Sequence, residues 1–435
     1  MIVRAATSSG KRVGRVVLSW EDEIDADRTF KGFRMIRPSS RTAQFHYAIR
    51  NIVSAAEERE RTGRAVTYLN IGDPQAHGFR PPAHVVEAAA RAVRERFTGY
   101  EHSAGLGEAR EAVACYATAL GAQTAPGDVL MTAGASEAAD LLLTALVEEG
   151  DEVLVPAPGY PLYPAILNRL GASARYYPLD PRAGWLPSAE EVESLVNERT
   201  RAVVLINPNN PTGSVTPDET TRRLLELAER RGLLVISDEV YRELCFDDPP
   251  APASLLAAES DVPVVTLESL SKTHMVPGWR VGWMRFTNAR LMPELVRAVH
   301  RLASGRLCSP TPAQYAVRPA LEGDRAFLDD FMREIKSRRD FLLRAVASVD
   351  GLSCVEPAAA FYAMLRAEDP ERRTDERFVL DLLEETGVLA VHGSGFGADP
   401  ASCHFRLVYL PDEAVLGGVF ERLAAFMHAQ AAARR

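Results

Sequence analysis

The sequence predicts an α/β protein with a mostly parallel sheet that helices cover on both faces. The first observation is a series of short runs rich in Val, Leu and Ile, at 128–134, 151–159, 201–208 and 233–241. The second is that amphipathic helical patterns, such as "SEAADLLLTALVEEG" and "TPDETTRRLLELAERRG", separate these runs. Strands of a covered parallel sheet read as continuous apolar runs because both of their faces are buried. The alternation therefore indicates strands that lie between two layers of helices.

Two helix starts in this region carry capping signals. "SAEE" places Ser188 at an N-cap with Glu191 three residues later, which is the pattern of a capping box. "TPDE" repeats the pattern, with Thr216 at the N-cap, Pro217 at the first helical position and Glu219 at the third. We expect helices to begin directly after Ser188 and Thr216.

The pattern changes after about residue 315. A long charged helical stretch, "RAFLDDFMREIKSRRDFLLRAVASV", precedes two short strand candidates, "AFYAML" and "CHFRLVYL". We therefore expect a second, smaller α+β domain near the C-terminus. The predicted division is an N-terminal extension at 1–42, an N-terminal part of the small domain or an arm at 43–79, a large domain at 80–315 and a C-terminal small domain at 316–435.

Composition and charge narrow the function. The 435 residues are 46% hydrophobic and 25% charged, as in ordinary globular proteins, and the formal net charge is −9. A nucleic-acid surface needs a concentrated basic field, so we expect no nucleic-acid partner. The five cysteines are scattered without C-x-x-C spacing, which favours reduced thiols over a disulfide frame or a zinc site. No metal is predicted.

Signals for membranes and export are weak. No apolar run approaches the roughly 20 residues that span a bilayer, so we expect no membrane association. The first 20 residues carry four basic side chains but no continuous apolar segment, which argues against a secretory signal and leaves a transit peptide open. The expected location is cytoplasmic.

The phosphate-binding motifs of NAD and ATP enzymes are absent from the sequence. "GLGEAR" at 105–110 and "GSGFGA" at 393–398 are rich in glycine, but neither gives G-x-G-x-x-G between a strand and a helix. No G-x-x-x-x-G-K-[ST] loop is present either. A nucleotide-dependent enzyme is therefore not predicted.

Four separated motifs carry a resemblance instead. They are "NPNNPTG" at 207–213, "SDEVY" at 237–241, "SLSK" at 269–272 and "PGWRVGW" at 277–283. In this order, each after a run that reads as a strand, they resemble the fold-type I pyridoxal-phosphate (PLP) enzymes of the class I/II aminotransferase family. The resemblance spans about residues 45–425. It implies a large domain with a mostly parallel seven-stranded sheet, a smaller α+β domain, PLP as cofactor and a homodimer.

The resemblance assigns the covalent chemistry to Lys272. An amine that forms a Schiff base must be partly unprotonated, and lysine meets this requirement when it is desolvated near other positive charge. Lys272 would hold PLP as a Schiff base and move a proton during turnover. Asp238 would face the pyridine nitrogen and keep it protonated, which makes the ring an electron sink.

The remaining cofactor contacts follow from the same resemblance. Tyr241 and Asn210 would hydrogen-bond the phenolic oxygen, and a cis peptide bond between Asn210 and Pro211 is a hypothesis at this stage. Ser269 and Arg280 would bind the phosphate. The phosphate would also meet the first helical amides after a strand, those of Ala135 and Ser136. Ser271 is either a further phosphate ligand or a packing hydroxyl.

Four residues are expected around the substrate and the ring. Tyr160 would stack on the pyridine ring, with a core tyrosine as the competing interpretation. Tyr100 would reach across the dimer interface to the neighbouring phosphate. By the resemblance, Arg406 would bind the α-carboxylate of the substrate. A strand arginine usually lies on a solvated face, but Arg406 alternates with apolar neighbours, which leaves it facing elsewhere. Gly72 would form a backbone turn beside the substrate.

Within the family the chain is most similar to the bacterial glutamate–pyruvate (alanine) aminotransferases, on stretches such as "LNIGDPQAHGF" and "LLEETGVLAVHGSGF". His77 and His274 depart from the usual residues and cast doubt on plain alanine as the substrate, although each is more simply a satisfied local residue. Arg306 either binds a distal carboxylate of the substrate or forms an ion pair at the surface. The expected function is transfer of an amino group between an L-amino acid and a 2-oxo acid by a ping-pong mechanism. The alternative is another PLP reaction, such as elimination or replacement, decarboxylation or carbon–carbon bond formation, in a specialised pathway.

Overall fold

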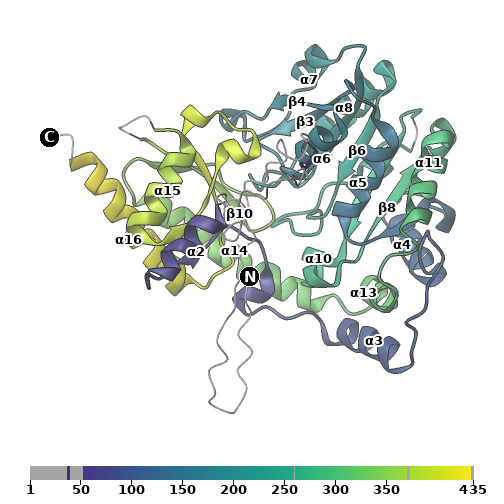
Figure 1. Ribbon diagram of the computed structural model, residues 1–435, viewed down its shortest axis with the longest axis horizontal. Helices are drawn as coiled ribbons and strands as arrows, with labels where there is room; N and C mark the ends of the chain where they lie inside the picture. Colours follow the sequence, from purple (N-terminus) through teal and green to yellow (C-terminus); the bar gives the residue numbers. More distant parts are fainter. Residues whose placement is uncertain (1–36, 40–51, 259, 370–372, 433–435) are drawn as a thin grey trace, which may run out of the picture.

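The computed structural model describes residues 37–39, 52–258, 260–369 and 373–432 (Figure 1). The expectation of an N-terminal extension lies almost entirely outside the described residues. Residues 43–51 of the predicted arm also lie outside the described residues.

The larger sheet has seven strands in the order β2-β8-β7-β6-β5-β3-β4. Its strands are β2 (Val129–Thr132), β3 (Glu152–Ala157), β4 (Ser173–Pro178), β5 (Thr200–Ile206), β6 (Leu234–Asp238), β7 (Val264–Ser269) and β8 (Gly282–Thr287). Strands β3, β4, β5, β6 and β7 pair in parallel. β8 is antiparallel to both of its neighbours, β2 and β7. The predicted mostly parallel sheet is confirmed.

Apolar residues alternate along these strands between two separate cores. In β5, Val204 and Ile206 join one core and Val203 and Leu205 join the other. Such alternation is expected because successive side chains of a strand point to opposite faces of the sheet. Both faces are covered, which explains why the strands read as uninterrupted apolar runs.

Different helices fill the two cores. Those packed on one face of the sheet are α5 (Ala135–Leu146), α6 (Leu162–Leu170) and α11 (Pro293–Gly305). Those packed on the opposite face are α7 (Ala189–Leu195), α8 (Asp218–Arg231) and α9 (Ala253–Leu256). A further core at the β2 edge holds α3 (Ala83–Arg94), α4 (Gly107–Ala119) and α13 (Val317–Glu322). The seven-stranded sheet and these helices form the large body of the protein, which occupies the right side of the view in Figure 1.

One of the two predicted helix starts is confirmed, and the other is displaced by one residue. Ser188 is the N-cap of α7, and its hydroxyl accepts a 3.3 Å hydrogen bond from the N–H of Glu191, so that prediction is confirmed. The prediction for Thr216 is wrong by one residue, because Pro217 is the N-cap of α8. The backbone of Thr216 is held elsewhere: its N–H and its carbonyl both pair with the side chain of Asn207, at 2.9 Å each.

The C-terminal elements form a second body around an antiparallel sheet with the order β12-β13-β10-β9. Its strands are β9 (Leu352–Cys354), β10 (Tyr362–Ala367), β12 (Val391–His392) and β13 (His404–Val408). The helices on this side are α2 (Val53–Arg61), α14 (Ala326–Ala347), α15 (Asp375–Thr386) and α16 (Glu413–Ala432). β1 (Thr67–Tyr68) pairs in parallel with β11 (Val388–Leu389), so chain that precedes the large sheet lies beside the C-terminal elements.

Short helices complete the description. The short α-helices are α10 (Leu270–Thr273) and α12 (Thr311–Gln314). The 3₁₀ helices are η2 (Pro74–His77), η3 (Pro126–Asp128), η4 (Pro181–Ala183), η5 (Pro277–Trp279), η6 (Ala289–Leu291), η7 (Gly393–Phe396) and η8 (Pro400–Ser402). Within the described ranges no helix is both long and apolar enough to cross a membrane. All five cysteines are free thiols.

Candidate active site

The predicted cofactor residues gather where parallel strands end. Asp238 is the last residue of β6 and Ser269 the last of β7, and Ser269 faces Gly282 of β8 across the ladder. The loop after β5 carries "NPNNPTG" at 207–213. In open α/β sheets, ligands bind in the crevice outside the carboxyl ends of the strands. The fold therefore places the polar motifs together at one edge of the sheet.

Lys272 lies on the short helix α10, directly after β7. Ser269 caps this helix, because its hydroxyl accepts a 3.3 Å hydrogen bond from the N–H of Ser271. The amine of Lys272 points inward and donates to the carbonyl of Gly72 at 2.6 Å. It also lies 5.8 Å from the centre of the Phe361 ring. Lys272 is thus half-buried between the two bodies of the protein and is not an exposed surface charge.

Asp238 is a buried carboxylate without a cation among the described residues. Its oxygens accept hydrogen bonds from the hydroxyl of Tyr163 at 2.8 Å and from the N–H of Val240 at 3.3 Å. Burial raises the pKa of Asp238 to about 6, and the two hydrogen bonds offset only part of this effect. A buried carboxylate in this state is stabilised by a cation placed beside it.

Tyr163 was missed by sequence reasoning. The stretch "APGYPLY" holds two tyrosines, and only the first, Tyr160, had been given a role. Tyr163 lies on α6 and is fully buried, and burial raises the pKa of its phenol, so it keeps the proton that it donates to Asp238. The available signal was its position in the first turn of the helix that directly follows the Tyr160 loop and β3.

Tyr241, Asn210 and Arg406 lie deeper in the same region, and a fourth residue joins them. The hydroxyl of Tyr241 lies 2.8 Å from that of Tyr362, which sequence reasoning had not singled out. The side-chain carbonyl of Asn210 accepts a 2.9 Å hydrogen bond from Arg406. Arg406 also donates to the backbone carbonyl of Asn70 and is only 1% exposed on strand β13. It therefore does not belong to a solvated strand face.

The residues expected at the phosphate form a cradle at the start of α5. Arg280 donates to the carbonyls of Pro277 and Ala133, each at 3.0 Å, which uses two of its five N–H groups. A Cβ atom on Gly134 would lie 2.4 Å from the guanidinium as it is placed, and the φ of +82° at this position also favours glycine. The first turn of α5 contributes the N–H groups of Ala135 and Ser136, which have no partner within the helix. Helix N-termini of this kind favour anions.

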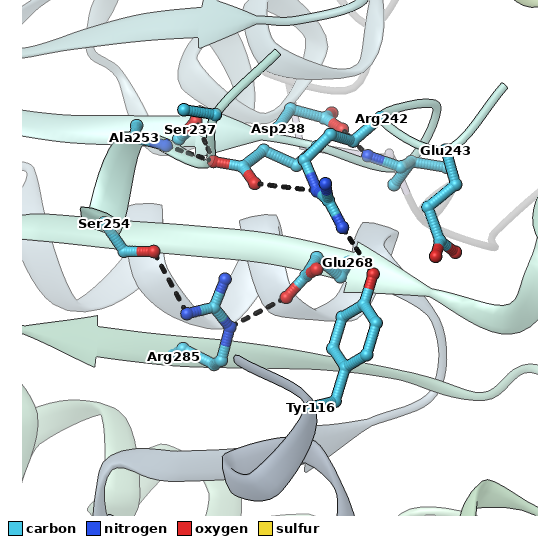
Figure 2. A network of polar contacts seen from close by, with 12 residues as sticks. Tyr116, Ser237, Asp238, Arg242, Glu243, Ala253, Ser254, Glu268 and Arg285 are labelled. Atoms are coloured by element: carbon cyan, nitrogen blue, oxygen red, sulfur yellow. Dashed lines mark hydrogen bonds and ion pairs between the residues drawn. The ribbon is translucent and has the colours of Figure 1, made fainter. Parts of the chain in front are cut away.

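A buried polar network lies along β6 and β7 (Figure 2). Because side chains alternate along a strand, its members Ser237 and Glu268 lie on the face opposite Asp238 and Ser269. Glu239 accepts hydrogen bonds from Ser237 and from the N–H of Ala253, both at 2.9 Å. Arg242 lies 3.7 Å from Glu239. Arg285 donates to Glu268 at 2.8 Å, and this ion pair is almost fully buried.

The surroundings shift the pKa values of the two acids of this network in opposite directions. Burial and the neighbouring Glu268 raise the pKa of Glu239. Burial alone would also raise the pKa of Glu268, but Arg285 and Arg242 hold it below its usual value. Glu239 directly follows Asp238, and Glu268 directly precedes Ser269. The network therefore fixes the backbone that carries two of the predicted cofactor residues.

Three other predicted residues lie apart from this cluster or at its rim. Tyr160 is half-buried and lines a cavity of about 520 Å³ between the two bodies of the protein. Tyr100 is 83% exposed within its own chain. Ser271 is buried next to Ser269, and its role as a ligand or a packing hydroxyl stays open.

The departures noted in the sequence have structural explanations. His274 is fully buried, with one ring nitrogen 2.9 Å from the hydroxyl of Thr273 and the other 2.9 Å from the carbonyl of Ala320. Burial lowers its pKa to about 4, so it is a neutral, satisfied core residue. His77 ends η2, and burial lowers its pKa as well. Arg306 pairs with Glu137 at 3.1 Å and donates to two backbone carbonyls, so it is held within the large body.

The hypothesis of a cis bond before Pro211 is wrong. Among the described residues the cis bonds are Ala157–Pro158 and Asn207–Pro208. The cis proline of the motif is therefore its first one, Pro208, three residues before the expected position.

The residues present fit PLP. The cradle of Arg280 and Gly134 offers unpaired donors to a phosphate, and the buried Asp238 lacks the positive partner that a protonated ring nitrogen supplies. Of the two lysines that the structure describes, Lys272 and Lys336, Lys272 is the one whose amine points into this crevice. Within the part of the chain that the structure describes, no group of three or more His, Cys, Asp or Glu side chains is placed to hold a metal.

Known proteins resemble this chain over most of its length. The family described as "Aminotransferase class I and II" matches residues 64–423. The alanine aminotransferase of Mycobacterium tuberculosis is 36% identical over 408 residues, which cover 91% of this chain and 93% of that protein. The glutamate–pyruvate aminotransferase AlaA of Escherichia coli is 34% identical and covers 86% of this chain and 94% of its own length. The structure of the alanine aminotransferase from Pyrococcus furiosus superposes with a TM-score of 0.88, at 37% identity over 90% of this chain and all of that one.

Proposed function

Because this chain belongs to the family of class I and II aminotransferases, we propose that it exchanges amino groups between L-glutamate or L-alanine and a 2-oxo acid, at a site built around Lys272. The chain is a fold-type I enzyme that depends on PLP and transfers nitrogenous groups. The predicted fold, cofactor and enzyme class are thereby confirmed. The roles of individual residues and the identity of the substrate are the proposal.

One observation carries the proposal: an amine, two phenols and a guanidinium converge around Gly72. Lys272 donates to the carbonyl of Gly72. A Cβ atom on Gly72 would lie 2.2 Å from the hydroxyl of Tyr362, which in turn contacts Tyr241 and stacks on Arg406. The crevice thus holds a nucleophile, hydrogen-bond donors and a carboxylate-binding cation within one set of contacts.

The bound cofactor supplies a carbonyl group that takes up the amine and a ring that takes up the electron pair released at the substrate α-carbon. Lys272 holds the cofactor through its amine and then accepts and returns the α-proton. Its hydrogen bond to Gly72 orients the amine toward the crevice. Asp238 supplies a fixed negative charge that Tyr163 orients. Tyr241 keeps its proton, because burial raises its pKa well above the usual value, and so it serves as a donor.

Arg406 orients the substrate in this proposal. Its guanidinium is buried and planar, and it binds a carboxylate through two parallel hydrogen bonds in the usual geometry. Its bond to Asn210 connects the carboxylate position to the residue proposed at the phenolic oxygen. A fixed carboxylate lets the α-C–H bond stand perpendicular to the cofactor ring, which aligns the breaking bond with the π system. Exchange in two half-reactions, the ping-pong order, follows from one site serving both amino donor and acceptor.

The choice of L-glutamate and L-alanine rests on the names of the relatives and on the structure around the histidines. The similar proteins are alanine and glutamate–pyruvate aminotransferases. His274, which had argued against alanine, is fully buried and contacts the carbonyl of Ala320 in the core. Arg306 is held by Glu137, so it is not placed to read a distal carboxylate.

A half-reaction measured by absorbance tests the proposal. The PLP-loaded protein is mixed with L-glutamate, L-alanine or L-aspartate in the absence of a 2-oxo acid. Loss of the visible band of the bound aldehyde form, with gain of the near-ultraviolet band of the amine form, is expected for the first two. Pyruvate should then restore the visible band. Should no common amino acid convert the cofactor, another PLP reaction in a specialised pathway replaces the present proposal.

We also propose a homodimer in which Tyr100 reaches the phosphate of the neighbouring subunit. Support comes from its 83% exposure and from the exposed apolar side chains of Val93 and Phe97 near it. Mixed dimers of Y100F and K272A subunits test this. One of their two sites pairs an intact Lys272 with an intact partner Tyr100, so activity should return on mixing. A cytoplasmic location and the division into large and small domains near residues 80 and 315 also belong to this proposal. The five free thiols agree with the location.

A further inference from the structure

Tyr362 lies between the cofactor half and the substrate half of the site. It is the first residue of β10 and is 2% exposed. Its hydroxyl contacts that of Tyr241, and its ring contacts the guanidinium of Arg406. On the premise of the proposed function, we propose that Tyr362 is a positioning residue that sets the donor strength of Tyr241 toward the cofactor and fixes Arg406 toward the substrate carboxylate.

The first half of this proposal follows from counting protons. Tyr241 has a single O–H, and a phenol is one donor that can also accept. When Tyr241 donates to the phenolic oxygen of the cofactor, its 2.8 Å contact with Tyr362 requires Tyr362 to be the donor. A hydrogen bond received by a hydroxyl polarises it and strengthens the bond that it donates. Tyr362 therefore strengthens the donation from Tyr241 to the cofactor.

The surroundings of Tyr241 support this direction. The titratable groups that act on it are Tyr362, Tyr160 and Arg406. Burial and the adjacent Tyr362 both raise the pKa of Tyr241, so Tyr241 keeps its proton at working pH. With Tyr362 as donor to Tyr241, the pair is a chain of two hydroxyls that ends at the cofactor.

The second half follows from the position of Arg406. Its guanidinium carbon lies 4.6 Å from the centre of the Tyr362 ring and 4.7 Å from that of Phe396. Two rings therefore contact the same cation, and cation–π contacts of desolvated groups are among the stronger ones. Asn210 and the carbonyl of Asn70 hold part of the same guanidinium. The rings restrict the group that would bind the carboxylate.

Backbone geometry adds a third contact. The hydroxyl of Tyr362 lies against Gly72, where a Cβ atom would approach it to 2.2 Å. The carbonyl of this same glycine accepts the hydrogen bond from Lys272. Tyr362 is thus held between the backbone that orients the amine and the phenol that serves the cofactor.

Three variants separate the two roles. Y362F removes the hydroxyl and keeps the ring, Y362L removes both, and F396L removes the other ring beside Arg406. Each PLP-loaded variant is titrated with acid and base while the absorbance of the bound cofactor is followed, and the KM for the amino donor is measured in parallel. Circular dichroism checks that each variant is folded.

Distinct outcomes are expected. Y362F should move the cofactor titration to higher pH by about one unit, the size expected for loss of one hydrogen bond to the donor, with KM within about twofold of the wild type. F396L should raise KM about tenfold without moving the titration. Y362L should do both.

Two results would overturn the inference while leaving the proposed function intact. One is a Y362F titration that is unchanged or moves to lower pH, since Tyr241 would then not depend on Tyr362 as donor. The other is a Y362L variant with unchanged KM. A wild-type protein that forms no visible band would overturn the proposed function and this inference together.

Discussion

The hydroxyl of Tyr163 donates a 2.8 Å hydrogen bond to Asp238, and both side chains are buried on the same face of the large sheet. Because Asp238 is the proposed partner of the cofactor ring nitrogen, this bond links a residue of α6 to the electronic state of the cofactor. Loss of the hydroxyl would leave Asp238 with the N–H of Val240 as its remaining donor.

The variant Y163F should lower kcat about tenfold and move the acidic limb of the pH–rate profile to higher pH. The reason is that the hydrogen bond from Tyr163 opposes the rise in the pKa of Asp238, so its loss lets that pKa climb further. The control is Y177F. Tyr177 is equally buried, but its hydroxyl donates to the carbonyl of Val204, outside the site. Equal profiles for the two variants would exclude a role for Tyr163 beyond packing.

Asp238 should make the cofactor-free protein less stable as pH rises. Its pKa in the folded state is about 6, above the ordinary value of 3.8, so the folded protein binds more protons than the unfolded chain between these values. The free energy of unfolding should therefore fall by about 3 kcal/mol as pH increases from about 3 to 7, since each pKa unit corresponds to about 1.4 kcal/mol.

Urea denaturation of cofactor-free wild type and D238N at several pH values measures this effect. The difference in unfolding free energy, D238N minus wild type, should grow with pH through this window and level off above it. With PLP bound, a positive ring nitrogen should stabilise the ionised carboxylate, so the cofactor should stabilise the wild type more at pH 7 than at pH 5. A pH-independent difference between the two proteins would contradict the assignment.

Arg406 and Arg306 form a matched pair for mutagenesis. R406Q should lower kcat/KM at least about 100-fold, mainly through KM, because it removes a buried cation from the position of the substrate carboxylate. R306Q should keep kcat/KM within about threefold of the wild-type value, since Arg306 pairs with Glu137 and donates to backbone carbonyls. Steady-state kinetics with L-alanine and L-glutamate compare them. A larger loss of kcat/KM in R306Q than in R406Q would show that the substrate carboxylate does not bind at Arg406.

The buried network of Figure 2 should contribute to stability as well as to position. E268Q removes the negative partner of Arg285, whose side chain is 1% exposed. Leaving such a charge without its partner costs about 3–5 kcal/mol, which urea unfolding of the cofactor-free protein can measure. D180N, which breaks the exposed pair with Arg182, is the control and should change the unfolding free energy little. Equal effects of the two substitutions would show that the network is not energetically special.

The sequence was most informative where chemistry follows a strand directly. Asp238 and Ser269 close apolar runs, and the structure confirms that both end parallel strands. Contacts between distant segments could not be read in this way. Tyr362 meets Tyr241 across 121 residues, and this contact depends on how the small antiparallel sheet packs on the large one. The hydrogen bond between the side chain of Asn207 and the backbone of Thr216 could not be predicted from the sequence either. Because of this bond, α8 begins one residue later than predicted.

Reduction with borohydride tests the central claim most directly. The chain contains four lysines, Lys11, Lys31, Lys272 and Lys336, so a tagged peptide identifies its residue without ambiguity. The PLP-loaded protein is reduced and digested, and the peptide that carries the cofactor is sequenced by mass spectrometry, with K336A as a control for a lysine outside the crevice. The account predicts one equivalent of label per chain at Lys272, its loss in K272A and its retention in K336A. Label on another lysine, or none at all, would contradict it.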